Sequence, residues 1–210
     1  MTARVRAALV GLLSAVVLCA CGSSQHNAIA LPNAVDIGFA QDMSVHHEQA
    51  ILMAQLALKD GTSAIADIAG AILSSQAQEV GAMRGWLKVW GQSPVDPSPM
   101  GWMSGMGGMS GMAMPAASPT PGSMDYAPMP GMATPAQMIR LTNARGKGFD
   151  ILFAQLMTRH HLGGIAMDRA AITQGASPLV SQLADQEINE QFQDISFLTA
   201  VLRSYGVKVT

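Results

Sequence analysis

The sequence predicts an all-α protein, a four-helix bundle built from two copies of one helical hairpin. Aromatic residues make up only 5% of the 210-residue chain, whereas Ala, Gly and Met are abundant; strands are usually richer in aromatic and β-branched residues. A segment of 18 residues recurs in the second half of the chain, and each copy precedes a second stretch of helical length. Each half is therefore one structural unit. A two-helix hairpin cannot bury its apolar face alone, so packing both units together gives the bundle.

The repeat aligns residues 36–53, DIGFAQDMSVHHEQAILM, with residues 150–167, DILFAQLMTRHHLGGIAM. Ten of the 18 positions are identical, and they include a pair of adjacent histidines. After one inserted residue, a weaker correspondence continues into the second helix of each unit. The chain is thus expected to contain a leader, a tether, a first hairpin at 34–91, a linker at 92–133 and a second hairpin at 134–210.

Helix-start and helix-stop residues set the boundaries within each unit. Gly61 and Gly175 stop the main helix of each unit, and Thr134-Pro135 and Ser177-Pro178 open two helices of the second unit. Helices are expected at 36–59, 63–90, 135–144, 147–173 and 178–205.

Residues 1–20 are interpreted as a signal peptide that forms no part of the fold. A basic start precedes an apolar run that is too short for a comfortable membrane span. The run ends in LCAC at residues 18–21, which resembles the lipobox of bacterial lipoproteins. We expect cleavage before Cys21, attachment of lipid such as palmitate to that cysteine, and a polar tether at 21–33. The mature protein is then anchored to the cell membrane and faces outside the cytoplasm. An ordinary secretory signal cleaved elsewhere is the alternative.

The segment 92–133 consists mostly of Gly, Pro, Ser, Met and Ala and lacks helical periodicity, so it is predicted to be a disordered linker. Nine of the 16 methionines lie in it. Five of them recur at every third residue, namely Met100, Met103, Met106, Met109 and Met112. Because the segment has no core face to fill, this spacing has no packing role, and we expect these thioethers to bind additional soft metal ions. Sacrificial oxidation of methionine is the alternative.

Each main helix carries a stripe of methionine and histidine. Because each residue advances by about 100° around a helix, Met43, His46, His47 and Met53 share one face of the first helix. The second unit repeats the arrangement. Pseudo-twofold packing of the units would bring both clusters into the bundle core, in a site with up to four imidazoles and two to four thioethers.

The ligand types of this site indicate a soft metal ion. Thioether sulfur is a neutral, soft ligand that selects copper(I), and imidazole also suits copper. Outside the cytoplasm thiolates tend to oxidise to disulfides, which thioethers cannot form. The predicted cofactor is therefore copper(I), and silver(I) should bind for the same reason, for metal sequestration or tolerance. The alternative is a structural or interaction lipoprotein of the envelope, in which methionine fills the core and histidine is hydrogen-bonded to Asp or Gln.

Other function classes find little support. The formal net charge is −2, with no basic stripe that would indicate nucleic acid. Di-iron bundles need Glu-x-x-His pairs, and Glu48, Glu79, Glu187 and Glu190 have no histidine three residues on. We expect a binding protein rather than an enzyme, with a metal ion and the membrane as its partners. The sequence does not indicate a protein partner.

The pattern Asp-x-x-Phe-x-x-x-Met-x-x-His-His-x-x-Ala-x-x-Met at 36–53 resembles the signature of the domain of unknown function 305 family. The second copy resembles it as closely, with Gly164 in place of the usual Ala. The resemblance implies a ferritin-like four-helix bundle, often secreted, with some members linked to copper binding and tolerance. Carried over by position, the implied metal ligands are Met43, His46, His47, Met53, Met157, His160, His161 and Met167.

Overall fold

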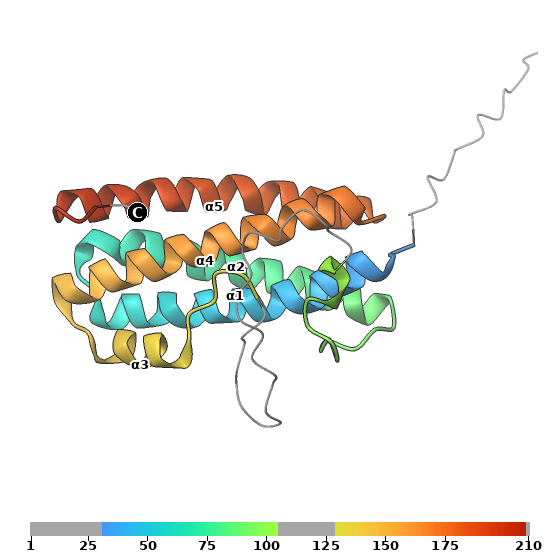
Figure 1. Ribbon diagram of the computed structural model, residues 1–210, viewed down its shortest axis with the longest axis horizontal. Helices are drawn as coiled ribbons and strands as arrows, with labels where there is room; N and C mark the ends of the chain where they lie inside the picture. The colour runs from blue at the N-terminus through green and yellow to red at the C-terminus, as the bar shows by residue number, and fades with distance from the viewer. Residues whose placement is uncertain (1–30, 105–128, 209–210) are drawn as a thin grey trace, which may run out of the picture.

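The computed structural model describes residues 31–104 and 129–208. Figure 1 shows the bundle from the side, with its four long helices α1 (Ala34–Asp60), α2 (Ser63–Val89), α4 (Gly146–Gln174) and α5 (Pro178–Ser204). A short helix, α3 (Pro135–Asn143), lies against α1 and α4, and a 3₁₀ turn, η1 (Gly101–Met103), lies against α1. No strand occurs within the described ranges, so the predicted all-α bundle is confirmed.

The helices begin and end within two residues of the predicted positions. Gly91 and Gly206, which correspond in the repeat, have φ values of 67° and 73° just after the last helix of each hairpin. This left-handed conformation favours glycine and stops a helix. Among the helices described here, none is both long and apolar enough to cross a membrane. The predicted signal peptide and the lipidation site Cys21 lie outside the described residues.

Helices α1 and α4 pack against each other and run in opposite directions (Figure 1). Asn33, the N-cap of α1, donates through its side chain to the carbonyl of Gln174 at the end of α4, at 2.8 Å. At the other end of the bundle, Thr62, which follows α1, donates hydrogen bonds to the carboxylate of Asp150, near the start of α4. The antiparallel pair therefore relates the two hairpins by the pseudo-twofold symmetry that the repeat predicts.

Two buried aspartates in equivalent repeat positions connect the hairpins at their ends. Asp36, in the first turn of α1, accepts hydrogen bonds from the backbone N–H groups of Ala176 and Ser177, immediately before α5, at 3.0–3.1 Å. Asp150 accepts from the N–H and hydroxyl of Thr62, the N-cap of α2, at 2.9 and 2.5 Å. Each carboxylate thus stabilises the positive N-terminal end of a helix in the other hairpin.

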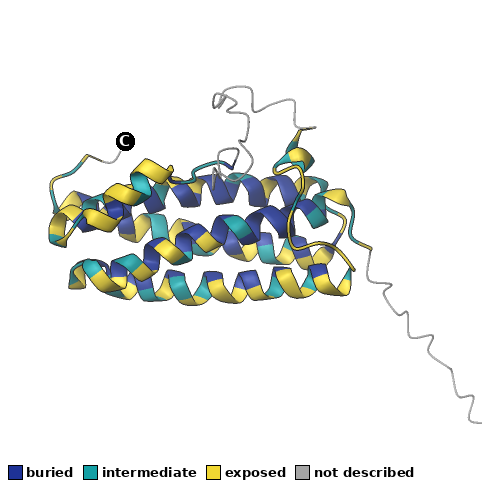
Figure 2. Ribbon diagram, turned by 90° about the horizontal axis from the view of Figure 1, so that it is seen from below, coloured by how far each residue is buried: buried dark blue, intermediate teal, exposed yellow. Residues whose placement is uncertain are grey.

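The apolar core consists of two clusters, one toward each end of the bundle, and Figure 2 shows the buried faces of the helices turned inward. One cluster includes Phe39 and Leu87, near the start of α1 and the end of α2. The other includes Ile65, Phe149 and Leu202, near the opposite helix ends. The core is therefore not continuous along the bundle, and buried polar residues lie between the two clusters on all four long helices.

The prediction that the whole of 92–133 is a disordered linker is wrong at both ends. The Trp102 indole donates to Asp42 at 2.9 Å and packs edge-on against Phe39, with ring centroids 6.1 Å apart. Gly38 gives the indole room, since a Cβ there would overlap it. Sequence reasoning treated the composition of the segment as uniform and so overlooked Trp102, an aromatic side chain large enough to bind this end to α1. Residues 105–128 of the linker lie outside the described ranges.

At the other end of the linker, Ala133 exchanges two hydrogen bonds with the Gln49 side chain. The Ala133 N–H donates to the amide oxygen at 2.6 Å, and the Gln49 amide nitrogen donates to the Ala133 carbonyl at 3.0 Å. Met129 is only 7% exposed. We call residues 129–133 the strap; its contacts fix it to α1 before α3 begins.

Replacing Asp36 with Ala should destabilise the protein because the substitution removes acceptors at the N-termini of both α1 and α5. We expect a loss of about 2–4 kcal/mol in the free energy of unfolding, from a lost cap and lost charge-assisted hydrogen bonds. Urea unfolding followed by circular dichroism measures it, with Asp185→Asn on the exposed face of α5 as the control. A loss no larger than that of the control would contradict the shared capping role.

Candidate metal centre

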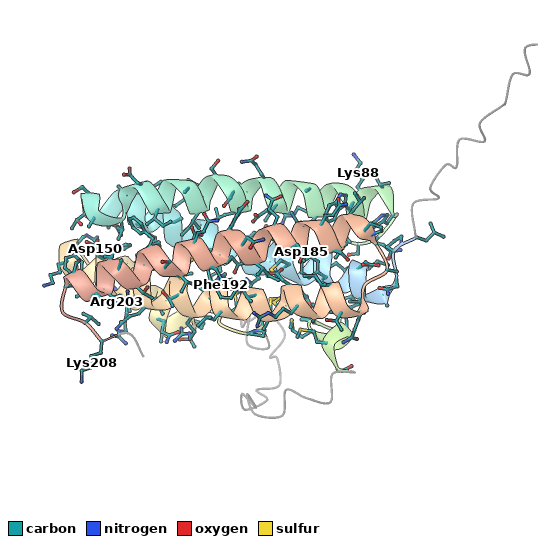
Figure 3. The ribbon with its side chains drawn as sticks, turned by 90° about the horizontal axis from the view of Figure 1, so that it is seen from above. Lys88, Asp150, Asp185, Phe192, Arg203 and Lys208 are labelled. Carbon is teal, nitrogen blue, oxygen red and sulfur yellow. The ribbon has the colours of Figure 1, made fainter. Side chains whose placement is uncertain are left out.

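On every long helix, a pair of buried histidine, glutamine or glutamate side chains lies between the two apolar clusters. Each is at most 5% exposed. On every helix they stand in sequence between residues of one cluster and residues of the other. We call this set the polar layer: His46, His47, Gln76, Glu79, His160, His161, Glu187 and Gln191. The layer crosses the middle of the bundle, at the level of α5 where Figure 3 labels Phe192.

His46 of α1 and His160 of α4 meet within the polar layer, beside residues 130 and 131. Their ring centroids are 3.8 Å apart and the rings are tilted by 33°. The Nε2 of His46 lies 3.0 Å from the carbonyl oxygen of Pro130. Because a carbonyl only accepts, Nε2 carries the proton and Nδ1 carries the lone pair. Within the described residues, that Nδ1 and both ring nitrogens of His160 have no hydrogen-bond partner.

Burial keeps both of these imidazoles neutral. Desolvation, followed by the repulsion of His47, lowers the pKa of His46 to about 3. Desolvation and the neighbouring histidines also lower the pKa of His160 well below its usual value. A neutral imidazole offers a lone pair without a competing proton, which is the state that binds metals.

His47 and His161 point to carboxylates instead. The Nε2 of His47 lies 2.9 Å from a Glu79 oxygen and 3.4 Å from a Glu187 oxygen. The Nε2 of His161 lies 3.0 Å from an oxygen of Asp194. Burial disfavours the charge on His47, but Glu187 and Glu79 outweigh it and raise the pKa of His47 to about 9. Glu79 and Asp194 occupy equivalent repeat positions, so a carboxylate beside the second histidine is common to both hairpins.

Glu187 and Asp168 break the symmetry of the repeat. The equivalent residues of the first hairpin are Ile72 and Ala54, both apolar. Burial raises the pKa of Asp168 well above its usual value, and the carboxylate of Glu187 raises it further. Sequence reasoning missed both as site residues because it looked only for Glu-x-x-His. The aligned repeat could have identified both residues, because at each of these positions the second copy has an acidic residue where the first copy has an apolar one.

The four predicted methionine ligands are fully buried but do not share one location. Met43 and Met167 belong to the apolar cluster on one side of the polar layer, together with Met83. Met53 and Met157 belong to the cluster on the other side. Of the eight predicted ligands, the structure therefore brings His46 and His160 into contact and places thioethers on both sides of the layer.

The strap lies directly on the histidine pair. Pro130 supplies the carbonyl that orients His46. Gly131, with a φ of 78°, passes so close to the backbone of Arg159 and His160 that a Cβ would overlap it. A Cβ at Gly163 would likewise overlap the Pro130 carbonyl. Two glycines thus allow the backbone to approach and fix the His46 ring from outside the helices.

The predicted linker ligands fall into two groups. Met100 and Met103 are partly buried and pack against the apolar cluster that contains Met43, so the expectation that they have no core face is wrong. The reason is again Trp102, which holds this turn against α1. Met106, Met109 and Met112 lie outside the described residues.

In the metal-free protein, the His46–His160 pair and His47 should not titrate together. We expect nitrogen-15 NMR of the imidazoles at pH 5.5 to show His46 and His160 neutral, and at pH 8 to show His47 still protonated. An unfolded histidine has a pKa near 6.5, so unfolding releases His46 and His160 to take up protons below that pH. Their contribution to stability is therefore lost as the pH falls from about 6.5 toward 3. If His46, His160 and His47 all titrated near pH 6.5, the burial and the carboxylate contacts described above would be contradicted.

The sequence matches the family described as domain of unknown function (DUF305) over residues 36–202. A DUF305 protein from Streptomyces coelicolor is 31% identical, with a TM-score of 0.70, over 83% of this chain and 94% of that one. A DUF305 fragment from Deinococcus radiodurans is 27% identical, with a TM-score of 0.65, over 82% and 97%. CopM in its Cu(II)-bound form is 25% identical, with a TM-score of 0.55, over 81% and 97%. No curated protein matches the chain. By sequence and by fold, the chain belongs to the DUF305 family.

Proposed function

We propose that this protein binds copper(I), and silver(I) by the same chemistry, at the His46–His160 pair between α1 and α4, midway along the bundle. The observation that carries the proposal is that three of the four imidazole nitrogens of this pair are buried without a hydrogen-bond partner in the described structure. An unpaired buried polar atom costs about 1–3 kcal/mol, against a total stability of about 5–15 kcal/mol for a typical domain. A core that had only to pack would be more stable with apolar side chains at these positions.

The donor set fits a soft ion. His46 and His160 offer neutral nitrogen ligands from opposite helices. Their ring centroids are 3.8 Å apart, so the rings would have to turn and move apart for two lone pairs to meet at one ion. Met43 and Met157 precede them by one turn on the same helices, so one thioether lies on each side of the polar layer. Thioether and imidazole together favour copper(I) over hard cations. His47 and His161 contribute less to this site because carboxylates hold them.

The relatives support a metal partner. CopM has been solved in Cu(II)-bound, Cu(I)-bound and silver-bound forms. The Streptomyces coelicolor relative is described as a secreted protein, which agrees with a location outside the cytoplasm. We further propose that the mature chain is held at the membrane through lipid on Cys21, and that it sequesters metal rather than catalysing a reaction.

The alternative is that the histidines are structural and linker methionines serve as an oxidation sink. The carboxylate partners of His47 and His161 agree with a structural role for those two residues. Among the described residues, His46 and His160 have unpaired nitrogens and no carboxylate partner, which favours metal binding for that pair.

The double substitution His46→Gln with His160→Gln should remove tight copper(I) binding while leaving the bundle folded. Loss of outer-shell partners alone costs about 10- to 100-fold in metal affinity, so loss of two ligands should cost at least that. Competition with a chromogenic copper(I) chelator measures the affinity, and circular dichroism checks the fold. The control is Met138→Leu on α3, a partly buried methionine outside the polar layer. Unchanged affinity in the folded double variant would refute the proposal.

We also propose that the linker methionines beyond the packed turn bind further soft ions weakly, with affinity gained from several sulfurs on one chain. Deleting residues 105–128 should lower the copper(I) stoichiometry and leave tight binding at the histidine pair intact. The deletion spares Met100, Met103 and the strap, since these pack on the bundle. Titration of the deleted and full chains tests it; equal stoichiometry would show that the segment is a spacer or an oxidation sink.

A further inference from the structure

We propose a second, chemically different metal site in the polar layer, formed by His47, Glu79 and Glu187, for a divalent first-row transition-metal ion such as Zn(II) or Co(II). The proposal goes beyond copper(I) binding and does not depend on it. The proposed site has mostly oxygen ligands, from α1, α2 and α5, and suits an ion of intermediate hardness. It lies in the same polar layer as the soft copper(I) site.

The geometry of the three side chains fits one ion. One ligand atom from each residue lies within 4.8 Å of the others. The His47 nitrogen is 2.9 and 3.4 Å from the two carboxylates. Two ligands on a tetrahedral ion with bonds of about 2.1 Å stand roughly 3.4 Å apart. Small side-chain movements would therefore place all three around a single ion, with a fourth position open.

Unpaired atoms aimed into the site provide a second observation. Within the described ranges, neither carboxylate oxygen of Glu187 accepts a hydrogen bond, and Glu187 is only 1% exposed. One oxygen of the fully buried Asp168 is also without a partner. Burying an uncompensated carboxylate is costly. His47 is the only cationic side chain of the described structure paired with Glu79 or Glu187, so the cluster keeps an excess of negative charge that a divalent ion would neutralise.

The chemistry of the ligands selects a different ion from the His46–His160 pair. Zinc(II) is bound in proteins by combinations of imidazole nitrogen and carboxylate oxygen, the two ligand types that this site offers. A soft monovalent ion such as copper(I) gains little from a carboxylate ligand. Asp168, close to Glu187 and held by the Gln191 amide at 3.4 Å, is placed to orient the Glu187 carboxylate. The repeat explains why there is one such site: the first hairpin has Ile72 where the second has Glu187.

Titration of the metal-free full-length protein with Co(II), followed by visible d–d absorption, tests the site, and Zn(II) should displace the cobalt. We expect one equivalent to bind, and Glu187→Gln to weaken binding by more than tenfold. The matched control is Asp185→Asn, an exposed carboxylate two residues away on α5 that Figure 3 labels. Zn(II) should raise the unfolding temperature of the wild type and of the control, but not of Glu187→Gln.

Two further arms separate this proposal from copper(I) binding. The His46→Gln, His160→Gln variant should keep Co(II) binding, and Glu187→Gln should keep tight copper(I) binding. If Glu187→Gln does not fold, the test uses the wild type and the Glu79→Gln variant instead. The wild type should then bind Co(II), and Glu79→Gln should bind it more weakly. Absence of Co(II) and Zn(II) uptake by the wild type, or uptake that survives the substitutions, would overturn the second site whatever the result with copper(I).

Discussion

Burial of polar side chains at the middle of the bundle is the constraint on which the rest of the structure depends. Four long helices could bury one continuous apolar core, yet here a layer of histidine, glutamate and glutamine divides it into two clusters. Unpaired polar atoms in such a layer oppose folding, so the two apolar clusters and the end caps must hold the layer in place. Asp36 and Asp150 do this from the ends, because each connects its own helix to the opposite hairpin. The strap does it from the side, through the Pro130 carbonyl on His46.

Duplication followed by divergence accounts for the chemistry of the layer. The features that the two hairpins share are structural: the crossed aspartate caps, the second histidine with its carboxylate, and the left-handed glycine after the last helix. The pseudo-twofold relation also places His46 against His160, so the central pair arises from one residue of each copy. Where the copies differ, at Glu187 and Asp168, the second copy adds two buried carboxyl groups that the first copy lacks. One layer thereby offers neutral nitrogen at the α1–α4 contact and carboxylate oxygen beside His47.

The repeat predicted the helices, their pairing and the meeting of the histidines, because a pseudo-twofold axis between two antiparallel helices brings together the equivalent residues that lie nearest to it. It could not predict how the four histidines divide their roles, since that depends on carboxylates of α2 and α5, where the two copies match only weakly. The methionine stripe was equally misleading: four thioethers share a helical face with the histidines, but the length of the helices distributes them over both apolar clusters. The strap and the Trp102 contact escaped notice because a Gly- and Met-rich composition hides the few residues that pack.

X-ray absorption at the copper edge of the protein loaded with one equivalent of copper(I) tests the central claim most directly, because it identifies the atoms bound to the metal. Binding at the central pair predicts the multiple scattering of imidazole rings, with two nitrogen ligands per copper and sulfur joining them from a neighbouring methionine. This signal should disappear in the folded His46→Gln, His160→Gln variant. A shell of sulfur alone in the intact protein would place the copper on methionines away from the pair and would contradict the account.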